Sequence, residues 1–274
     1  MSLAQFTFES EYLQGNTTIS VILPDKPRTK TPAQFYGSGK RYKVLWLLHG
    51  TFGDHSDWLR KSNIELYACE KDLIVVMPSG LNANYANWEK FSLGYNMYDF
   101  LFEELMPLIY NWFPASDKRE DNFIAGLSMG GRGTCVYAMN HPEKFAGAAI
   151  LSACPRDTDW IRENDPRLWQ RTEGCIENRG GYEAYQASYE NTWRVLDEQV
   201  AAGVSLPKLY FACGKQDHLY PVYNHFKEHA KEIGLDATFE EIEGYRHEWR
   251  FWDLTIQKAL DFFGLTANDA GNPF

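Results

Sequence analysis

The sequence contains few cysteines, and none of them is arranged to bind a metal or to exchange disulfides. Its 274 residues include five cysteines, and no C-x-x-C pair occurs. They are Cys69, Cys135, Cys154, Cys175 and Cys213. An odd number at such wide spacing favours reduced thiols over a disulfide framework or a zinc site, so we expect a cytoplasmic protein.

Signals for secretion and for membrane insertion are also missing. No apolar run approaches the roughly 18 residues that a membrane-spanning helix needs. Residues 1–7 contain no basic stretch followed by an apolar block, so we expect no signal peptide. The formal net charge is −10 and there is no basic stripe, so we expect neither nucleic acid nor an anionic membrane as a partner.

Motifs for metals and nucleotides are absent as well. His225 and His229 have the spacing of the H-E-x-x-H zinc motif, but Phe226 stands where that motif needs glutamate. Both histidines lie in an amphipathic helical pattern, and we interpret them as surface residues. No phosphate-binding glycine motif follows a predicted strand. We therefore expect no metal and no cofactor.

What the sequence does contain is an alternation of apolar runs and amphipathic stretches. The apolar runs are residues 42–48, 72–77, 123–125, 145–151, 209–212 and 238–242, and a hairpin is predicted over 6–23. Helical patterns cover residues 98–112, with a bend at Pro107, and residues 220–233 and 248–263. Runs that are apolar on both faces are typical of parallel strands covered on both sides. The alternation predicts a doubly wound, mostly parallel α/β sheet flanked by helices, in a single domain over residues 1–274.

Two segments interrupt this alternation. Residues 25–41 are rich in proline, lysine, glycine and serine, and are predicted to form a loop. From about residue 154 to residue 206, aromatic residues lie among many charges, which indicates a partly helical, cap-like insertion over the sheet. It begins at the carboxyl end of a strand, where α/β sheets place their binding crevice. The pattern fits either a lid over the site or a segment that only packs against the rest of the domain.

The sharpest local signal is G-L-S-M-G-G at residues 126–131, which follows a predicted strand and precedes a helical stretch. In this context G-x-S-x-G is the nucleophile elbow of the α/β-hydrolase fold. The turn is so tight that side chains at Gly126 and Gly130 would meet neighbouring backbone, and Ser128 is forced into a strained conformation that exposes its hydroxyl. The N-terminus of the following helix favours negative charge at the same point. Ser128 is therefore the predicted nucleophile.

A serine hydroxyl needs a base beside it, and seven histidines compete for that role. In the α/β-hydrolase fold the acid and then the histidine follow the serine along the chain. This order excludes His55 and His49, and we interpret His49 as a structural residue that braces its loop. His247 lies in a loop between the last predicted strand and the final helix, from which it can return to the serine. We predict His247 as the base.

The acid of the triad is expected at the end of the preceding strand. Asp217 follows the apolar run 209–212 and precedes His247 along the chain. A carboxylate there would hold the imidazole in the required tautomer and stabilise the imidazolium. The rivals Asp253 and Glu248 fall on the helix that begins at the histidine. We therefore predict Asp217 as the acid.

A developing oxyanion needs amide donors that are in place before it forms. The Met129 N–H, next to the serine, is the expected first donor. The second should come from the loop after the strand at residues 42–48, and we predict the N–H of Thr51, with that of Phe52 as the alternative. Tyr95 and Trp249 are candidates for the wall of the substrate pocket, although both could equally belong to the core.

Five stretches of the sequence together resemble the esterase D-like family of α/β-hydrolases. They are LLHGTFGDHSDWLRKSNIE, DLIVVMPS, FIAGLSMGGRG, ACGKQDHLY and GYRHEWRFWD, in the expected order. Within the family, the chain resembles the bacterial tributyrin esterases of the EstA type. The resemblance implies hydrolysis of short-chain acyl esters with Ser128, Asp217 and His247 as triad, and oxyanion donors at Thr51 and Met129. It also implies a small-molecule ester substrate and a cytoplasmic enzyme that can form homo-oligomers.

The predicted reaction is a two-step acyl transfer through an acyl-enzyme on the serine. The wider family includes feruloyl and acetylxylan esterases, S-formylglutathione hydrolases and mycolyltransferases, so the acyl and alcohol parts stay open. An aromatic content of 15% favours the alternative of a carbohydrate acetyl or feruloyl esterase, and a thioesterase is a further alternative. A binding module with an inactive hydrolase fold is the third hypothesis, and the intact set of triad residues argues against it.

Overall fold

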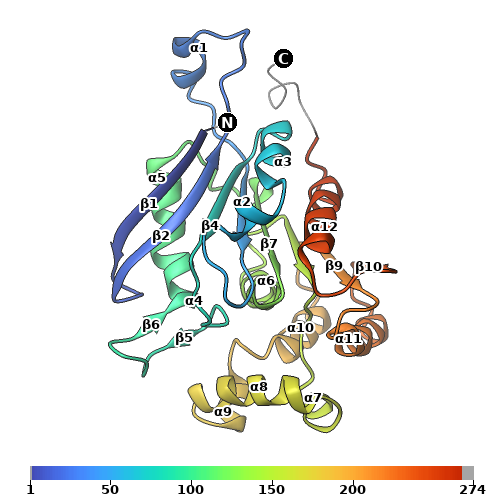
Figure 1. The fold of residues 1–274 in the computed structure, drawn as a ribbon. Coiled ribbons are helices and arrows are strands. Elements are labelled where there is room, and N and C mark those ends of the chain that lie inside the picture. The colour runs from blue at the N-terminus through green and yellow to red at the C-terminus, as the bar shows by residue number, and fades with distance from the viewer. Residues whose placement is uncertain (1, 267–274) are drawn as a thin grey trace.

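The computed structural model describes residues 2–266 of the chain, and its centre is a sheet of eight strands (Figure 1). The strands of this sheet are β1 (Ser2–Ser10), β2 (Gly15–Leu23), β3 (Val44–Leu48), β4 (Ile74–Pro78), β7 (Asn122–Leu127), β8 (Gly147–Leu151), β9 (Lys208–Gly214) and β10 (Ala237–Ile242). Their order across the sheet is β1-β2-β4-β3-β7-β8-β9-β10. The pairs β1–β2 and β2–β4 are antiparallel, and the remaining strands run parallel. This is the predicted doubly wound sheet.

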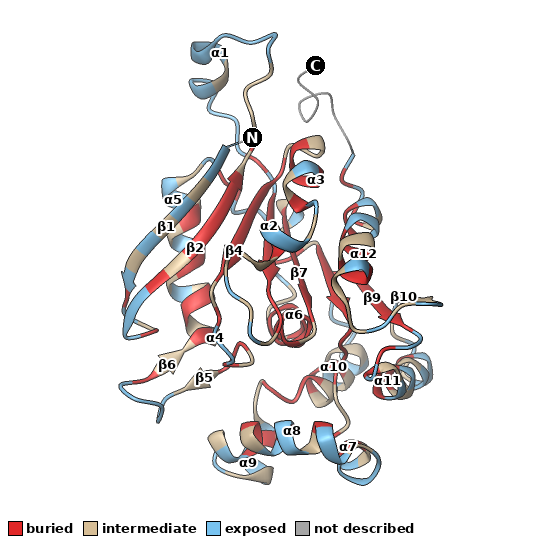
Figure 2. Cartoon of the chain, viewed as in Figure 1, coloured by how far each residue is buried: buried red, intermediate tan, exposed pale blue. Residues whose placement is uncertain are grey.

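The central strands are buried on both faces because helices cover the sheet on each side (Figure 2). In β3, for example, Trp46 packs into one core and Leu45 and Leu47 pack into the other. Alternate side chains of a strand point to opposite faces, so a strand between two helical layers needs apolar residues at every position. That requirement explains why the sequence shows continuous apolar runs rather than alternating ones.

One face of the sheet is covered by α2 (Asp57–Lys61), α3 (Ile64–Glu70) and α12 (Trp249–Phe262). The other is covered by α4 (Met97–Asp99), α5 (Met106–Trp112), α6 (Met129–Asn140) and α11 (Tyr220–Glu232). A 3₁₀ turn spans Arg119–Asp121, and a separate two-stranded ribbon joins β5 (Asn87–Trp88) to β6 (Tyr95–Asn96). Nowhere within residues 2–266 is a helix both long and apolar enough to cross a bilayer.

Two local predictions need correction. The segment 25–41 is not entirely loop, because Thr31 caps a short exposed helix, α1 (Pro32–Tyr36). The helix predicted over 98–112 is divided, since a π-helical segment, Phe100–Leu105, separates α4 from α5. Pro107 follows this segment near the start of α5, where it supplies no N–H to extend the ladder in which the Met106 N–H donates to the Leu101 oxygen.

Four helices lie between β8 and β9 along the chain, and they gather at one end of the molecule, below the sheet in the view of Figure 1. They are α7 (Thr158–Asn164), α8 (Pro166–Asn178), α9 (Tyr182–Ala187) and α10 (Thr192–Ala201). We call the segment from residue 154 to residue 206 the insertion. It contains the small buried cluster of Cys175, Ile176 and Tyr185, and α10 packs against α6.

The insertion also packs against α11, which corrects the interpretation of two histidines as surface residues. His225 stacks on Trp160 and Trp193, with ring centroids 4.7 and 5.4 Å away. His229 stacks on Trp193 at 4.1 Å. Their Nε2 atoms also lie 3.0 Å from Asp157 and 2.7 Å from Asp197. The amphipathic pattern of α11 could not reveal this, because the cover comes from a segment without a regular pattern.

Candidate active site

Ser128 stands in the turn between β7 and α6, and its backbone is strained as the sequence predicts. Its φ and ψ are 53° and −114°, a region that residues with side chains seldom adopt. A Cβ atom on Gly126 would lie 2.4 Å from the carbonyl of Gly130, and one on Gly130 would lie 2.4 Å from the Leu48 oxygen. Glycine is therefore required at both positions. The turn is held by a 2.8 Å hydrogen bond from the Ser128 N–H to the Leu151 oxygen.

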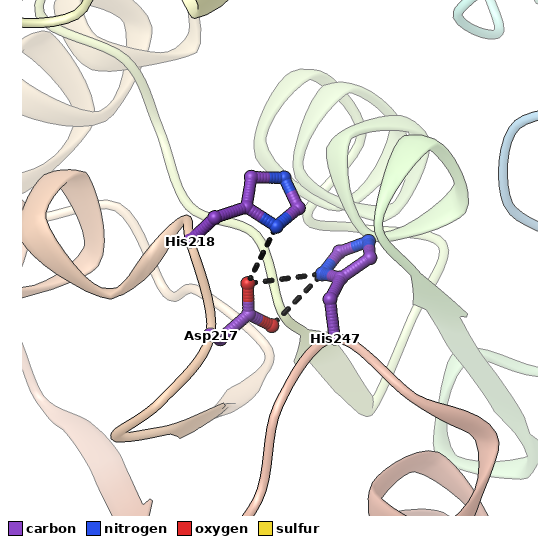
Figure 3. Close-up of side chains that lie close together, drawn as sticks. All are labelled: Asp217, His218 and His247. Atoms are coloured by element: carbon purple, nitrogen blue, oxygen red, sulfur yellow. Dashed lines mark hydrogen bonds and ion pairs between the residues drawn. The ribbon is translucent and has the colours of Figure 1, made fainter.

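His247 lies in the loop between β10 and α12, beside the serine hydroxyl. Its Nε2 is 2.9 Å from Ser128 Oγ. Its Nδ1 is 2.8 and 3.0 Å from the two carboxylate oxygens of Asp217, the contacts drawn in Figure 3. The Trp252 ring meets the imidazole edge-on, with centroids 4.9 Å apart. A Cβ atom on Gly214 would lie 2.4 Å from the Tyr245 oxygen, so the glycine at the end of β9 lets this loop approach.

Asp217 follows β9 and is 3% exposed. One of its oxygens also accepts a 2.9 Å hydrogen bond from the Leu219 N–H. Burial alone would raise the pKa of Asp217, but the hydrogen bond and charge of His247, with further donors, hold that pKa below its usual value. The carboxylate is therefore ionised and can orient the imidazole and stabilise its cation.

His218 is a member of this cluster that the sequence reasoning did not single out. Its ring centroid lies 4.6 Å from that of His247, and its Nδ1 lies 3.5 Å from an Asp217 oxygen. Burial, and then the neighbouring His247, lowers the pKa of His218. Its position directly after the predicted acid was the available signal.

Within residues 2–266, Asp217, His218 and His247 also form a group that could hold a metal ion. Each offers one ligand atom, and these atoms lie within 4.8 Å of one another. The same carboxylate already accepts hydrogen bonds from His247 and from the Leu219 N–H. A cation here would have to compete with the hydrogen bond between Asp217 and His247.

The amides of Thr51 and Met129 belong to residues that line the same pocket as Ser128. In the part of the chain that the structure describes, neither amide donates to a protein acceptor. The alternative donor, the Phe52 N–H, is already bonded to Asn82 Oδ1 at 2.9 Å.

His49 braces the loop that carries Thr51. Its Nε2 accepts a 2.8 Å hydrogen bond from the Gly80 N–H, so its Nδ1 carries the proton and donates to the Gly50 oxygen at 2.7 Å. The ring is 1% exposed, and burial lowers its pKa. The neutral imidazole therefore joins the loop after β3 to the loop after β4.

Neither Tyr95 nor Trp249 is among the described residues that line the pocket around Ser128. Trp249 begins α12 and packs edge-on against Trp58 and Trp252, in the core on the α2 side of the sheet. Tyr95 lies in the β5–β6 ribbon and lines a different hollow. The walls of the pocket come instead from the insertion and from the loop after β9, including Leu168 and Leu219.

Comparison with known proteins identifies the family to which this chain belongs. Residues 10–263 match the family model named Esterase, described as "Putative esterase". The chain belongs to this esterase family. An acetyl esterase of Caldicellulosiruptor saccharolyticus is 31% identical over 286 aligned positions, which cover 98% of this chain and 100% of that protein.

Two solved structures from Staphylococcus aureus are similar to the esterase along its length. One is FphF, a fluorophosphonate-binding serine hydrolase in a substrate-bound structure, with TM-score 0.78, 30% identity, and coverage of 96% of this chain and 98% of that chain. The other is the S-formylglutathione hydrolase FrmB as apoenzyme, with TM-score 0.77, 29% identity and the same coverage. The sheet, the family and these neighbours establish an α/β-hydrolase fold and a serine esterase that hydrolyses carboxylic esters.

Proposed function

We propose that Ser128, His247 and Asp217 form the catalytic triad of this esterase. The supporting observation is the chain of hydrogen bonds that runs from the Asp217 carboxylate through both nitrogens of His247 to the Ser128 hydroxyl. His247 Nε2 takes the hydroxyl proton while Ser128 Oγ attacks the ester carbonyl. The imidazolium then gives that proton to the departing alcohol, which leaves an acyl-enzyme. Water repeats the same steps and releases the acid.

The tetrahedral intermediate carries a negative charge that needs donors fixed in advance. We propose the Thr51 and Met129 amides for this role, because both flank Ser128 and neither donates to another protein group in residues 2–266. Met129 also begins α6, whose N-terminus favours negative charge. The engaged amide of Phe52 argues against the alternative donor.

For the substrate, we propose small esters with short acyl chains, in the manner of acetyl and tributyrin esterases. The acetyl esterase relative and the limited apolar wall offered by Leu168 and Leu219 support this proposal. A thioester such as S-formylglutathione is the second candidate, favoured by the 29% identity to FrmB. Rates on nitrophenyl esters from acetate to octanoate, on S-formylglutathione and on methyl ferulate would separate these substrate classes.

We further propose that residues 1–274 act as one domain, with the insertion as a cap over the triad. Leu168 of the insertion shares the pocket with Ser128, which supports this arrangement. The five cysteines are unpaired and buried, which agrees with a cytoplasmic location. A homo-oligomer is also proposed, and light scattering on the purified protein would measure its size.

The triad is tested by Ser128→Ala. We expect its kcat for nitrophenyl acetate to fall by at least about a thousandfold, because the nucleophile is lost. Labelling by a fluorophosphonate probe should disappear as well. Ser205→Ala, at an exposed serine of the insertion, is the matched control and should keep both signals. Persistent labelling and turnover in a folded Ser128→Ala protein would contradict the proposal.

A further inference from the structure

The wall of the pocket at Ser128 contains more positive charge than the overall composition suggests. The esterase has a formal net charge of −10, yet Arg156, Arg167 and Arg171 all line this pocket. The acidic residue that lines it with them is Asp165, whose carboxylate caps α8 by accepting the Leu168 N–H at 2.9 Å. The excess of guanidinium groups is therefore local to the pocket that contains the nucleophile.

Arg156 is the most informative of the three, because it is half-buried and has no carboxylate partner. It follows β8, and its Nη1 lies 3.4 Å from Thr172 Oγ1. Among the described residues, no acidic side chain lies within ion-pair distance of Arg156. A charge removed from water without a partner is costly, so it indicates a partner that arrives from outside.

A neighbouring arginine, Arg132, differs from Arg156 because an acidic side chain lies beside its charge. Arg132 is buried, and its guanidinium lies 3.5 Å from Glu190. Burial, and then the charge of Arg132, lowers the pKa of Arg156. Arg156 thus has a nearby like charge and no ion pair among residues 2–266, whereas Arg132 has an acidic partner.

The other two arginines extend the positive wall toward the reacting centre. Arg171 Nη2 lies 3.3 Å from Thr51 Oγ1, so the charge of α8 reaches the loop that carries a proposed oxyanion donor. Arg167 and Arg171 are exposed, and neither forms an ion pair with an acidic side chain of the described residues. All three guanidinium groups are therefore available to a molecule in the pocket.

We propose that the preferred substrate of the esterase carries a carboxylate, and that Arg156, flanked by Arg167 and Arg171, binds it in the pocket at Ser128. The proposal rests on the proposed function, since it names the substrate class of the same site. A guanidinium presents two parallel N–H donors that match the two oxygens of a carboxylate. Arg156 is half-buried and forms no ion pair with a described residue, so a carboxylate on the substrate would supply the missing counter-charge.

The test compares esters that differ only in charge. For a carboxylate on the acyl side, the pair is 4-nitrophenyl hydrogen glutarate and its methyl ester; for the alcohol side, it is 4-acetoxybenzoate and its methyl ester. We expect the wild type to prefer the charged member of at least one pair in kcat/KM. In Arg156→Met, the ratio of charged to neutral kcat/KM for that pair should fall about tenfold to a hundredfold, since a charge-assisted hydrogen bond is lost.

Two further variants separate a binding role from a structural one. Arg156→Lys keeps the charge but loses the two parallel N–H donors of the guanidinium. Its ratio of charged to neutral kcat/KM should therefore lie between those of the wild type and Arg156→Met. Arg60→Met removes an exposed arginine of α2, outside the pocket, and should leave the ratio unchanged. Because Arg156 lacks a counter-charge, Arg156→Met should melt at the same temperature as the wild type or higher.

The proposal is overturned if the wild type shows no preference for either charged ester, or if the Met and Lys variants keep the wild-type ratio. A fall in melting temperature with equal losses on charged and neutral esters would make Arg156 a structural residue. If the wild type hydrolyses none of these esters, charged or neutral, the proposed function fails instead. The two failures are therefore distinguishable.

Discussion

The loops at the carboxyl edge of the sheet and the helices of the insertion build different parts of one site. The loops after β7, β9 and β10 carry Ser128, Asp217 and His247, which are joined by hydrogen bonds between 2.8 and 3.0 Å. The insertion carries Leu168 and Arg171, which contact the same pocket from outside the sheet. The groups proposed to react thus lie on loops of the sheet, and the groups proposed to select the substrate lie on the insertion.

The two regions also differ in what holds them in place. The sheet lies between two large apolar cores, and its central strands are fully buried. The insertion has a small cluster of its own and depends on contacts with α6 and α11. A tightly packed core tolerates little displacement, whereas helices held on its surface can change with less effect on the reacting groups. Substitutions in the two regions should therefore have different kinetic consequences.

Among substitutions that leave the triad residues in place, the largest effect is expected for Gly130→Ala, which tests the sheet side. The added Cβ would lie 2.4 Å from the Leu48 oxygen and 2.6 Å from the His49 oxygen, and both are backbone atoms that cannot rotate away. The loop with Thr51 must shift, and displacements near 1 Å can cost about a hundredfold in rate. We expect kcat/KM for nitrophenyl acetate to fall by about a hundredfold or more, with a lower melting temperature.

Gly174→Ala is the matched change in the insertion. No atom lies within 4 Å of a Cβ placed on Gly174, which is inside α8. Alanine favours a helix over glycine by roughly 0.5–1 kcal/mol, so this variant should be as stable as the wild type or more so. If Gly130→Ala kept full activity, or if Gly174→Ala lost as much, the distinction between the two regions would be lost.

A smaller effect is expected for Trp193→Ala, which loosens the insertion. Trp193 stacks on His225 and His229 of α11 and meets Phe226 edge-on at 5.8 Å. Each of these three ring pairs contributes about 0.5–1.5 kcal/mol, so the free energy of unfolding should fall by roughly 1.5–4.5 kcal/mol. We expect KM to rise severalfold while kcat changes less, because the triad is not touched. Denaturant unfolding and steady-state kinetics measure both quantities.

Trp112→Ala provides the control for removal of an indole. Trp112 is 65% exposed on α5 and touches neither the insertion nor the described pocket at Ser128. Its KM should equal that of the wild type. A Trp193→Ala protein with unchanged KM and a much lower kcat would mean that the insertion acts on the reacting groups themselves.

The sequence predicted the sheet well because each strand carries a local signal. A strand buried on both faces must be apolar throughout, and tight turns such as the one at Gly126 and Gly130 admit little else than glycine. Chain order then sufficed to nominate Ser128, Asp217 and His247, which the structure brings together. These inferences depend on neighbours in the sequence or on strand order, and both can be read without coordinates.

The walls of the pocket could not be predicted in the same way. Trp249 is close to His247 in sequence, but the rotation of α12 directs its ring to Trp58. Arg156 and Arg171 reach the pocket through the path of the insertion, which follows no regular apolar pattern. Contacts of this kind depend on how one segment packs over another. The pattern of apolar residues in a single sequence does not predict that packing.

The smallest effect is a pH dependence on the sheet side, at His49. Its pKa is lowered by burial, so the folded protein resists protonation of this ring. The unfolded chain takes up that proton near a pKa of about 6.5, so acidification below that value favours the unfolded state. The stabilisation contributed by neutral His49 is therefore fully present above pH 6.5 and decreases as the pH falls.

His49→Gln isolates this contribution, because glutamine can donate and accept hydrogen bonds but does not titrate. At pH 7.5 the variant should be less stable than the wild type, since the bonds from Gly80 and to Gly50 are disturbed. Between pH 7.5 and 5.5 the difference in free energy of unfolding should narrow by about 1 kcal/mol. Urea unfolding at both pH values measures it. A difference that stays constant or widens at pH 5.5 would mean that the ring gains a proton without cost, and that its burial does not hold it neutral.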